Sequence, residues 1–240
     1  MRKLSRVPVC RGCLDQIEPL AADYFCADCR TPFVNPAPLD ENGRCPLCRL
    51  GLKGFDAAYS FGAYEGTLRD LIHLLKYDGI RTLAKELGRR LAEAFPRDEK
   101  FDVIVPMPLH WLRLWRRGFN QSALLAGEIA RRTGIPAAPL ARRTRSTPPQ
   151  AGLSNPKRRA NVSGAFAVRR GRSVDGLRVL LVDDVMTTGA TAGACALALK
   201  RAGAKYVALL ALARTDRRSP VWRADTGSFE RTISPGVSEC

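Results

Sequence analysis

The stretch "VLLVDDVMTTGAT", residues 179–191, decides the fold that this chain can adopt. Its four apolar residues at 179–182 are typical of a buried strand, and they run directly into two adjacent aspartates, Asp183 and Asp184. Successive strand residues point to opposite faces, so the two carboxylates cannot share one core pocket, and a buried carboxylate without a partner is costly. We therefore expect both to face water, a cation or a hydroxyl-rich ligand.

Small and hydroxylated residues follow the aspartates, namely Thr187, Thr188, Gly189, Ala190 and Thr191. A helix is expected directly afterwards, and the N–H groups at a helix N-terminus form a ready phosphate site. The motif thus places hydrogen-bond acceptors beside a phosphate cradle, which suits a sugar 5-phosphate. The simpler alternative is a capped helix that follows a strand and binds nothing.

Three other nucleotide or phosphate motifs do not match. A Walker A loop requires a lysine after its last glycine, and none follows Gly189. The G-x-G-x-x-G motif of dinucleotide-binding folds is absent. A phosphorelay receiver domain also has a strand that ends in paired acids, but too little chain follows Asp184 for the rest of such a domain.

Apolar periodicity predicts alternating strands and helices through the middle of the chain. Strands are expected at 57–64, 101–109, 178–184 and 206–214, and helices at 65–77, 80–95, 120–134 and 189–204. This order predicts an α/β fold with a mostly parallel sheet flanked by helices, in which ligands bind beyond the carboxyl ends of the strands. The two aspartates lie at such an end.

The charge of the chain favours a polyanionic partner. Its 240 residues include 39 Lys and Arg against 23 Asp and Glu, a net charge of +16. Residues 141–172 hold nine of these cations and no acid, although a solvated basic loop would look the same. No apolar run reaches about 18 residues and no secretory signal is evident, so we expect no membrane span and a cytoplasmic protein.

Six of the eight cysteines form three CxxC pairs near the N-terminus: Cys10/Cys13, Cys26/Cys29 and Cys45/Cys48. In a reducing compartment this pattern predicts a structural Zn²⁺ site rather than disulfides, because two CxxC pairs supply four thiolates for a tetrahedral ion. One Zn²⁺ ion uses four of these six cysteines, so two cysteines remain without a role as ligands. The spacing leaves open which pairs bind. We favour the first two, with the third structural or a weaker ligand set.

Several stretches together resemble the ComF family, the competence-associated phosphoribosyltransferase-like proteins. The stretch at 179–191 is similar to the phosphoribosyl pyrophosphate (PRPP) loop of type I phosphoribosyltransferases. The resemblance is narrowed to ComF by the CxxC cluster and by "LIHLLKYDG" (71–79), "VPMPLHWLRLWRRGFNQS" (105–122) and "TPPQAGLSNPKRRANVSGAF" (147–166). It covers residues 8 to about 214.

The resemblance implies an enzyme that uses PRPP together with Mg²⁺. In similar enzymes the acids at the positions of Asp183 and Asp184 take the ribose hydroxyls, partly through Mg²⁺, and the loop at 187–191 holds the 5-phosphate. The segment Pro106-Met107-Pro108 resembles one that contacts pyrophosphate through exposed N–H groups of a strained backbone. The arginines near enough in sequence to join it are Arg116 and Arg117.

The basic stretch occupies the place of the mobile hood that closes over pyrophosphate in similar enzymes. Its cations include Arg142, Arg145, Lys157, Arg158 and Arg159. Departure of pyrophosphate requires neutralisation of its charge, for which arginines and a metal are suited, and a closing lid would exclude water. No base-reading pattern is recognisable in this stretch, so the acceptor, expected to be nucleobase-like, is not identified.

We expect three regions: a zinc-ribbon module at 1–54, a phosphoribosyltransferase domain at 55–214 and a polar, disordered tail at 215–240. The alternative function is a non-catalytic protein that responds to PRPP or a nucleotide, or that binds single-stranded DNA. Besides PRPP, the expected partners are single-stranded DNA or the competence machinery. Trp111 and Trp115, which alternate with arginines, could stack on bases or could form the core face of an amphipathic helix.

Histidines and the "LKY" stretch supply weaker candidates. Lys76 and Tyr77 match a stretch of the family and gain some functional weight from that resemblance. His110 follows the Pro-Met-Pro segment and could contact pyrophosphate, whereas His73 is expected to be a structural residue.

Overall fold

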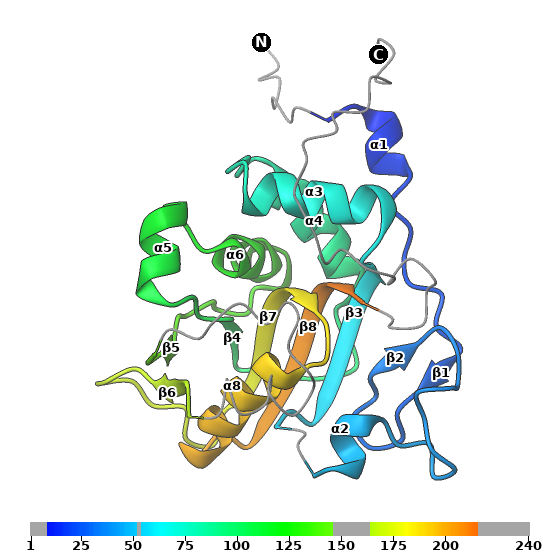
Figure 1. The fold of residues 1–240 in the computed structure, drawn as a ribbon. Helices are drawn as coiled ribbons and strands as arrows, with labels where there is room; N and C mark the ends of the chain where they lie inside the picture. Colours follow the sequence, from blue (N-terminus) through cyan, green and yellow to red (C-terminus); the bar gives the residue numbers. More distant parts are fainter. Residues whose placement is uncertain (1–8, 52–53, 146–163, 216–240) are drawn as a thin grey trace.

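A parallel sheet of four strands forms the centre of the fold (Figure 1). The computed structural model describes residues 9–51, 54–145 and 164–215. In sheet order the strands are β3 (Ala57–Ala63), β8 (Tyr206–Arg214), β7 (Arg178–Met186) and β4 (Val103–Pro106), and each neighbouring pair is parallel. The four predicted strands and the predicted α/β class are thereby confirmed, with β4 shorter than expected.

Helices cover both faces of the sheet. One face carries α3 (Gly66–Lys76), α4 (Leu83–Leu91) and α6 (Gln121–Thr133), and the other carries α8 (Ala190–Arg201), as predicted (Figure 1). Along β7 the apolar side chains alternate between these two cores, with Leu181 on the α8 side and Leu180 on the other. No helix in the described ranges is long and apolar enough to cross a membrane.

The connection from β4 to β7 contains elements that the periodicity did not predict. They are α5 (Trp111–Arg117) and a short antiparallel pair, β5 (Ala141–Arg143) with β6 (Phe166–Val168). A short 3₁₀ turn, η1 (Ala92–Ala94), also extends α4. Helix α5 buries none of its residues, and Trp111 and Trp115 are 65% and 80% exposed, so the core-face interpretation of these tryptophans is wrong.

Part of the predicted hood lies outside the described residues. The ends of the basic stretch contain the paired strands β5 and β6, whereas Lys157, Arg158 and Arg159 fall within 146–163. The tail at 216–240 also lies outside the described residues. Their predicted roles stay predictions.

The N-terminal segment crosses the edge of the sheet at β3. It consists of α1 (Arg11–Asp15), β1 (Tyr24–Phe25), β2 (Pro32–Phe33) and α2 (Pro46–Arg49). The N–H of Leu20 donates to the carbonyl of Phe61 (2.6 Å), and the N–H of Ala58 donates to the carbonyl of Cys29 (2.9 Å). These bonds cover an edge strand that would otherwise present unpaired backbone groups. They also place α1 and the β1–β2–α2 unit at different faces of the sheet (Figure 1).

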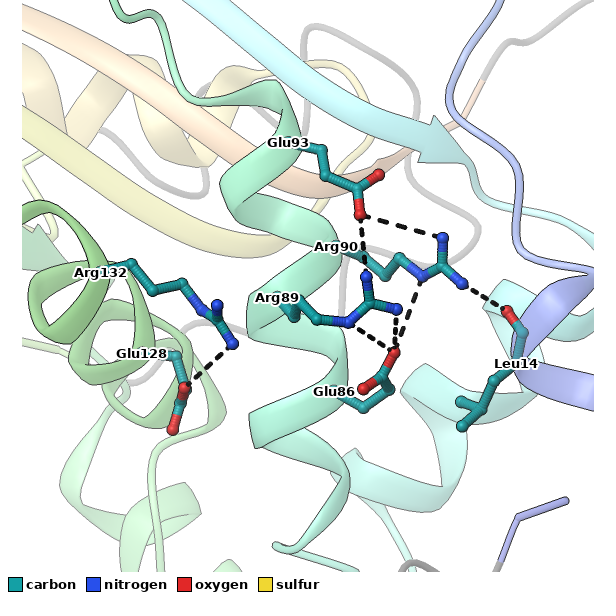
Figure 2. Close-up of polar contacts among 7 residues, drawn as sticks. All are labelled: Leu14, Glu86, Arg89, Arg90, Glu93, Glu128 and Arg132. Atoms are coloured by element: carbon teal, nitrogen blue, oxygen red, sulfur yellow. Dashed lines mark hydrogen bonds and ion pairs between the residues drawn. The ribbon is translucent and has the colours of Figure 1, made fainter. Parts of the chain in front are cut away.

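An arginine–glutamate network fixes α1 against α4 (Figure 2). Arg90 donates through Nη2 to the carbonyl of Leu14 at 3.0 Å, while its guanidinium lies within 4.0 Å of Glu86 and Glu93. Exposed ion pairs contribute little stability, but this half-buried arginine orients the first helix. Figure 2 also shows the neighbouring partners Arg89, Glu128 and Arg132.

Gly54, between α2 and β3, packs directly on α8. A Cβ added at Gly54 would lie 1.9 Å from the carbonyl oxygen of Gly193, so only glycine permits this approach. The cysteines of the β1–β2–α2 unit share one hydrophobic cluster with the sheet and with α8. The division into regions at 1–54, 55–214 and 215–240 stays a prediction.

We predict that Gly54→Ala lowers the free energy of unfolding by about 1–3 kcal/mol, because the added methyl group forces the two backbones apart. Gly127→Ala, at an exposed position of α6 with no atom within 4 Å of the new Cβ, is the matched control and should be neutral or stabilising by about 0.5–1 kcal/mol. Urea denaturation measures both. Equal stability of the two variants would contradict the close contact.

Candidate functional site

A pocket of about 800 Å³ opens at the carboxyl ends of β4 and β7. It brings together three stretches that are far apart in sequence: the end of α3, the segment from β4 into α5, and the loop from β7 into α8. Of the residues predicted to bind PRPP or act in catalysis, those that line it are Asp183, Asp184, Thr187, Gly189, Thr191, Met107, Pro108, Arg116 and Arg117. Pro106, Thr188 and Ala190 lie beside it without lining it.

The loop between β7 and α8 turns sharply at Gly189, which has a φ of 76°. Such a left-handed conformation favours glycine, and it lets the helix start at once. The N–H of Ala190 donates to Oγ1 of Thr188 at 3.3 Å. Further N–H groups in the first turn of a helix have no acceptor within that helix, and Thr191 and Ala192 of this turn line the pocket. The loop therefore suits a phosphate group.

The two aspartates are held by different partners. Asp183 accepts hydrogen bonds at Oδ1 from the hydroxyl of Ser122 (3.0 Å) and from the N–H of Asp184 (2.9 Å). Asp184 accepts at Oδ1 from the N–H of Val185 (2.8 Å), and its Oδ2 lies 2.7 Å from Nζ of Lys76. Ser122 of α6 thus supports Asp183, and Lys76 of α3 supports Asp184.

These partners drive the two pKa values in opposite directions. Burial and the adjacent charge of Asp184 raise the pKa of Asp183 to about 7. Burial also opposes ionisation of Asp184, but the charge and hydrogen bond of Lys76 outweigh it and hold the pKa of Asp184 below its usual range. Asp184 is therefore the ionised member of the pair, and Asp183 is the member that exchanges a proton near neutral pH.

The "NQS" of the "RRGFNQS" stretch positions the site from the N-terminus of α6. Asn120 accepts from the N–H of Ser122 (3.0 Å) and donates to the carbonyl of Met107 (3.0 Å), so it caps the helix and fixes the Pro-Met-Pro segment. Gln121 hydrogen-bonds Asp184 and accepts from Arg117 (2.8 Å). Sequence reasoning missed Gln121 and Ser122. The sequence feature that could have indicated them is the run of three polar residues, Asn120 to Ser122, at the start of a predicted helix.

Five cations line the pocket together with the two carboxylates: Lys76, Arg113, Arg116, Arg117 and Arg143. Burial lowers the pKa of Arg117 and that of Arg143. Arg113 and Arg143 were not predicted to bind, whereas Arg142 and Arg145 of the predicted hood are exposed and do not line the pocket. Tyr77 lines it beside Lys76, and its ring lies 5.5 Å from the Arg117 guanidinium.

Two expectations about the Pro-Met-Pro region need correction. The N–H of Met107 donates to the carbonyl of Val182 at 2.8 Å, and proline has no N–H, so this segment does not present exposed N–H groups. His110 does not line the pocket. It is buried and caps α5, with Nδ1 accepting from the N–H of Leu112 at 3.3 Å.

A second cluster lies in the β1–β2–α2 unit, where the Sγ atoms of four cysteines lie within 4.8 Å of one another. They are Cys26, Cys29, Cys45 and Cys48. The preference for the first two CxxC pairs is therefore wrong. The Sγ atoms of Cys10 and Cys13 lie 3.6 Å apart at α1. Leu14 of this helix and the nearby Ile17 pack in the core on the other face of the sheet. The chain crosses β3 between them and the cluster, which separates the first pair from the other two.

The cysteine cluster fits a tetrahedral zinc ion. The Sγ atoms of Cys26 and Cys48 are 3.6 Å apart and those of Cys29 and Cys45 are 3.7 Å apart. Zn–S bonds of about 2.3 Å in a tetrahedron give sulfur separations of about 3.8 Å. The N–H of Cys45 also donates to Sγ of Cys26 at 3.3 Å, as expected for a metal-binding knuckle. Four thiolates around one ion leave no open position, so the cluster is suited to structure.

Comparisons with known proteins show which families and structures this chain is similar to. The phosphoribosyl transferase domain family matches residues 120–236. Competence protein F of Haemophilus influenzae is 31% identical over 86% of this chain and 90% of its own length. The DNA utilization protein YhgH of Escherichia coli K12 is 38% identical over 80% of this chain and 84% of its own length. A glutamine PRPP amidotransferase from B. subtilis, of known structure, superposes on 54% of this chain and 26% of its own with a TM-score of 0.38 and 27% identity.

We predict that Cys45→Ser reduces bound zinc from about one ion per chain to none, because three thiolates and a hydroxyl do not complete the site. Cys10→Ser is the matched control and should retain the ion. Elemental analysis of the purified full-length variants measures the zinc content. Loss of zinc from the Cys10 variant together with its retention by the Cys45 variant would restore the earlier assignment.

Proposed function

This chain belongs to the ComF family, and we propose that its pocket binds PRPP with Mg²⁺ and transfers ribose 5-phosphate to a nucleobase-like acceptor. The names of its relatives, competence protein F and DNA utilization protein, support a role in the uptake or use of DNA. The observation that carries the proposal is the pairing of Asp183 and Asp184 with a phosphate-suited loop in one cationic pocket.

Each part of PRPP has a suitable partner in the pocket. The 5-phosphate suits the turn at Gly189 and the first turn of α8. The ribose hydroxyls can donate to the aspartates, and pyrophosphate suits the arginines Arg113, Arg116, Arg117 and Arg143, whose planar guanidinium groups match phosphate oxygens. The ligand thus spans the pocket from the α8 loop to α5.

The chemistry that these residues support is displacement of pyrophosphate from the ribose carbon. As the carbon–oxygen bond breaks, negative charge grows on pyrophosphate, and the fixed arginine charges stabilise it. Positive charge grows on the sugar ring, and the carboxylates of Asp183 and Asp184 can offset that charge. No side chain of the pocket needs to attack the sugar, because the acceptor does so.

The oxygen donors of the pocket fit Mg²⁺ that arrives with the ligand. Mg²⁺ commonly uses one or two carboxylates together with substrate phosphates, and it would neutralise pyrophosphate as that group leaves. Zinc in the cysteine cluster has a separate, structural role, since the cluster packs into the core beside α8.

We predict that Asp184→Asn lowers affinity for PRPP with Mg²⁺ by at least about 100-fold, because the ionised member of the pair is lost. Zinc content should not change. Calorimetric titration with PRPP, with and without Mg²⁺, measures binding, and release of pyrophosphate with a panel of nucleobases then measures transfer.

Asp98→Asn is the matched control for this experiment. Asp98 is exposed and does not line the pocket, so its variant should bind PRPP like the wild type. Unchanged affinity in the Asp184 variant would exclude the loop from PRPP binding. Tight binding without pyrophosphate release for any acceptor would favour the non-catalytic alternative, a protein that responds to PRPP.

A second candidate function, binding of single-stranded DNA, is favoured by the surface of α5. Trp111 and Trp115 are exposed on the same short helix that directs Arg113, Arg116 and Arg117 to the pocket. Aromatic rings beside cations form the stacking and phosphate contacts that single-strand binders use. The net charge of +16 also favours binding of the phosphate backbone of DNA.

We predict that Trp115→Ala weakens binding of a single-stranded oligonucleotide by about 1–3 kcal/mol without changing PRPP affinity, because one stacking surface is lost. Phe25→Ala, which removes a 56% exposed ring from β1, is the matched control. Fluorescence anisotropy at several salt concentrations measures both. If Phe25→Ala loses more oligonucleotide affinity than Trp115→Ala, the DNA-binding surface lies on the β1–β2–α2 unit instead of α5.

A further inference from the structure

Lys76 occupies the position beside Asp184 that a cation would take. It is the last residue of α3, and its side chain extends from the helix end to the carboxyl end of β7. Its Nζ lies 2.7 Å from Oδ2 of Asp184, with 19% of the lysine side chain and 5% of the aspartate side chain exposed. Among the ion pairs within the described ranges, this one has the most buried carboxylate.

The position of Lys76 is not explained by helix capping alone. A lysine in the last turn of a helix is favourable because it offsets the helix dipole. A lysine that only offsets the helix dipole can stay in solvent near the last carbonyl groups of its helix. Lys76 instead lines the pocket and contacts a buried carboxylate of a different element, at the cost of desolvating its ammonium group.

The ion pair between Lys76 and Asp184 reduces the negative charge that would attract a metal ion to the ligand-free pocket. Two adjacent carboxylates would attract a divalent cation, but Lys76 already balances Asp184, and Asp183 is engaged by Ser122. The four pocket arginines add further repulsion. A divalent ion arriving alone would have to displace an ammonium group and approach a net positive surface.

Resting on the proposed function, we propose that Lys76 is a positioning residue: an internal counter-ion that keeps Asp184 from binding a divalent cation until a pyrophosphate-bearing ligand enters. Pyrophosphate offers the lysine another anionic partner in the same pocket, and the flexible four-carbon stem lets Nζ move from Oδ2 to a phosphate oxygen. Asp184 is then free to accept a ribose hydroxyl or to contact the ion that the ligand carries. Metal binding thus follows ligand binding.

The test measures binding of Mn²⁺, a spectroscopic substitute for Mg²⁺, by electron paramagnetic resonance on the zinc-loaded full-length protein. Wild type should bind little Mn²⁺ alone and should bind it when PRPP is present. Lys76→Met should bind Mn²⁺ alone about tenfold more tightly than wild type, because Asp184 has lost its counter-ion. Lys76→Arg, which keeps the charge, should resemble wild type.

Lys85→Met is the matched control, since Lys85 is exposed on α4 and does not line the pocket. Equal Mn²⁺ affinity of Lys76→Met and wild type would overturn the proposal, as would tight binding of Mn²⁺ by wild type in the absence of PRPP. If Lys76→Met does not fold, Lys76→Gln removes the charge and keeps a donor for Asp184. The wild-type measurement stands in either case.

The same experiment separates this proposal from the proposed function. Tighter Mn²⁺ binding by the Lys76 variant, with no PRPP binding by wild type, would support the counter-ion role and reject PRPP as the ligand. If wild type binds PRPP and the Lys76 variant has the same Mn²⁺ affinity as wild type, PRPP is supported as the ligand and the counter-ion role of Lys76 is rejected.

Discussion

Burial of β7 on both faces is the constraint on which the rest of the structure depends. The strand pairs with β8 on one side and β4 on the other, and helices cover both of its surfaces. Charged residues are tolerated in such a strand only near its carboxyl end, where it leaves the core. Asp183 and Asp184 therefore lie in the last part of β7, just beyond its pairing with β4 and shortly before the start of α8. The position of the pocket follows from the packing of the core.

Much of this arrangement could be predicted because it depends on local patterns. The apolar run at 179–182, the periodicity of α3 and α6, and the glycine-containing loop each determine their own element. The contributions of Ser122, Gln121 and Arg143 could not be predicted in the same way. Their roles depend on which elements meet at the sheet edge, and that information is not contained in the spacing of nearby residues.

Two of the corrections, those of the cysteine pairs and of the Pro-Met-Pro segment, have the same kind of cause. The sequence alone favoured the first two CxxC pairs, but the chain crosses β3 and places Cys10 and Cys13 against the opposite core from Cys26. Likewise, the Pro-Met-Pro segment resembles a phosphate contact, but the parallel register uses the N–H of Met107 to pair with β7. Tertiary placement and sheet pairing decided both outcomes.

The chain segment that runs over β3 has a consequence for any attempt to study the two regions apart. A fragment that starts after residue 54 would lack the backbone partners of Phe61 and Ala58 and would present β3 as a bare strand. Such an edge pairs readily with the same strand of another copy, so the fragment would aggregate. A zinc ion bound by the four clustered cysteines would stiffen the unit that covers the strand. If the cysteine cluster holds such an ion, chelators should produce a milder form of this exposure in the full chain.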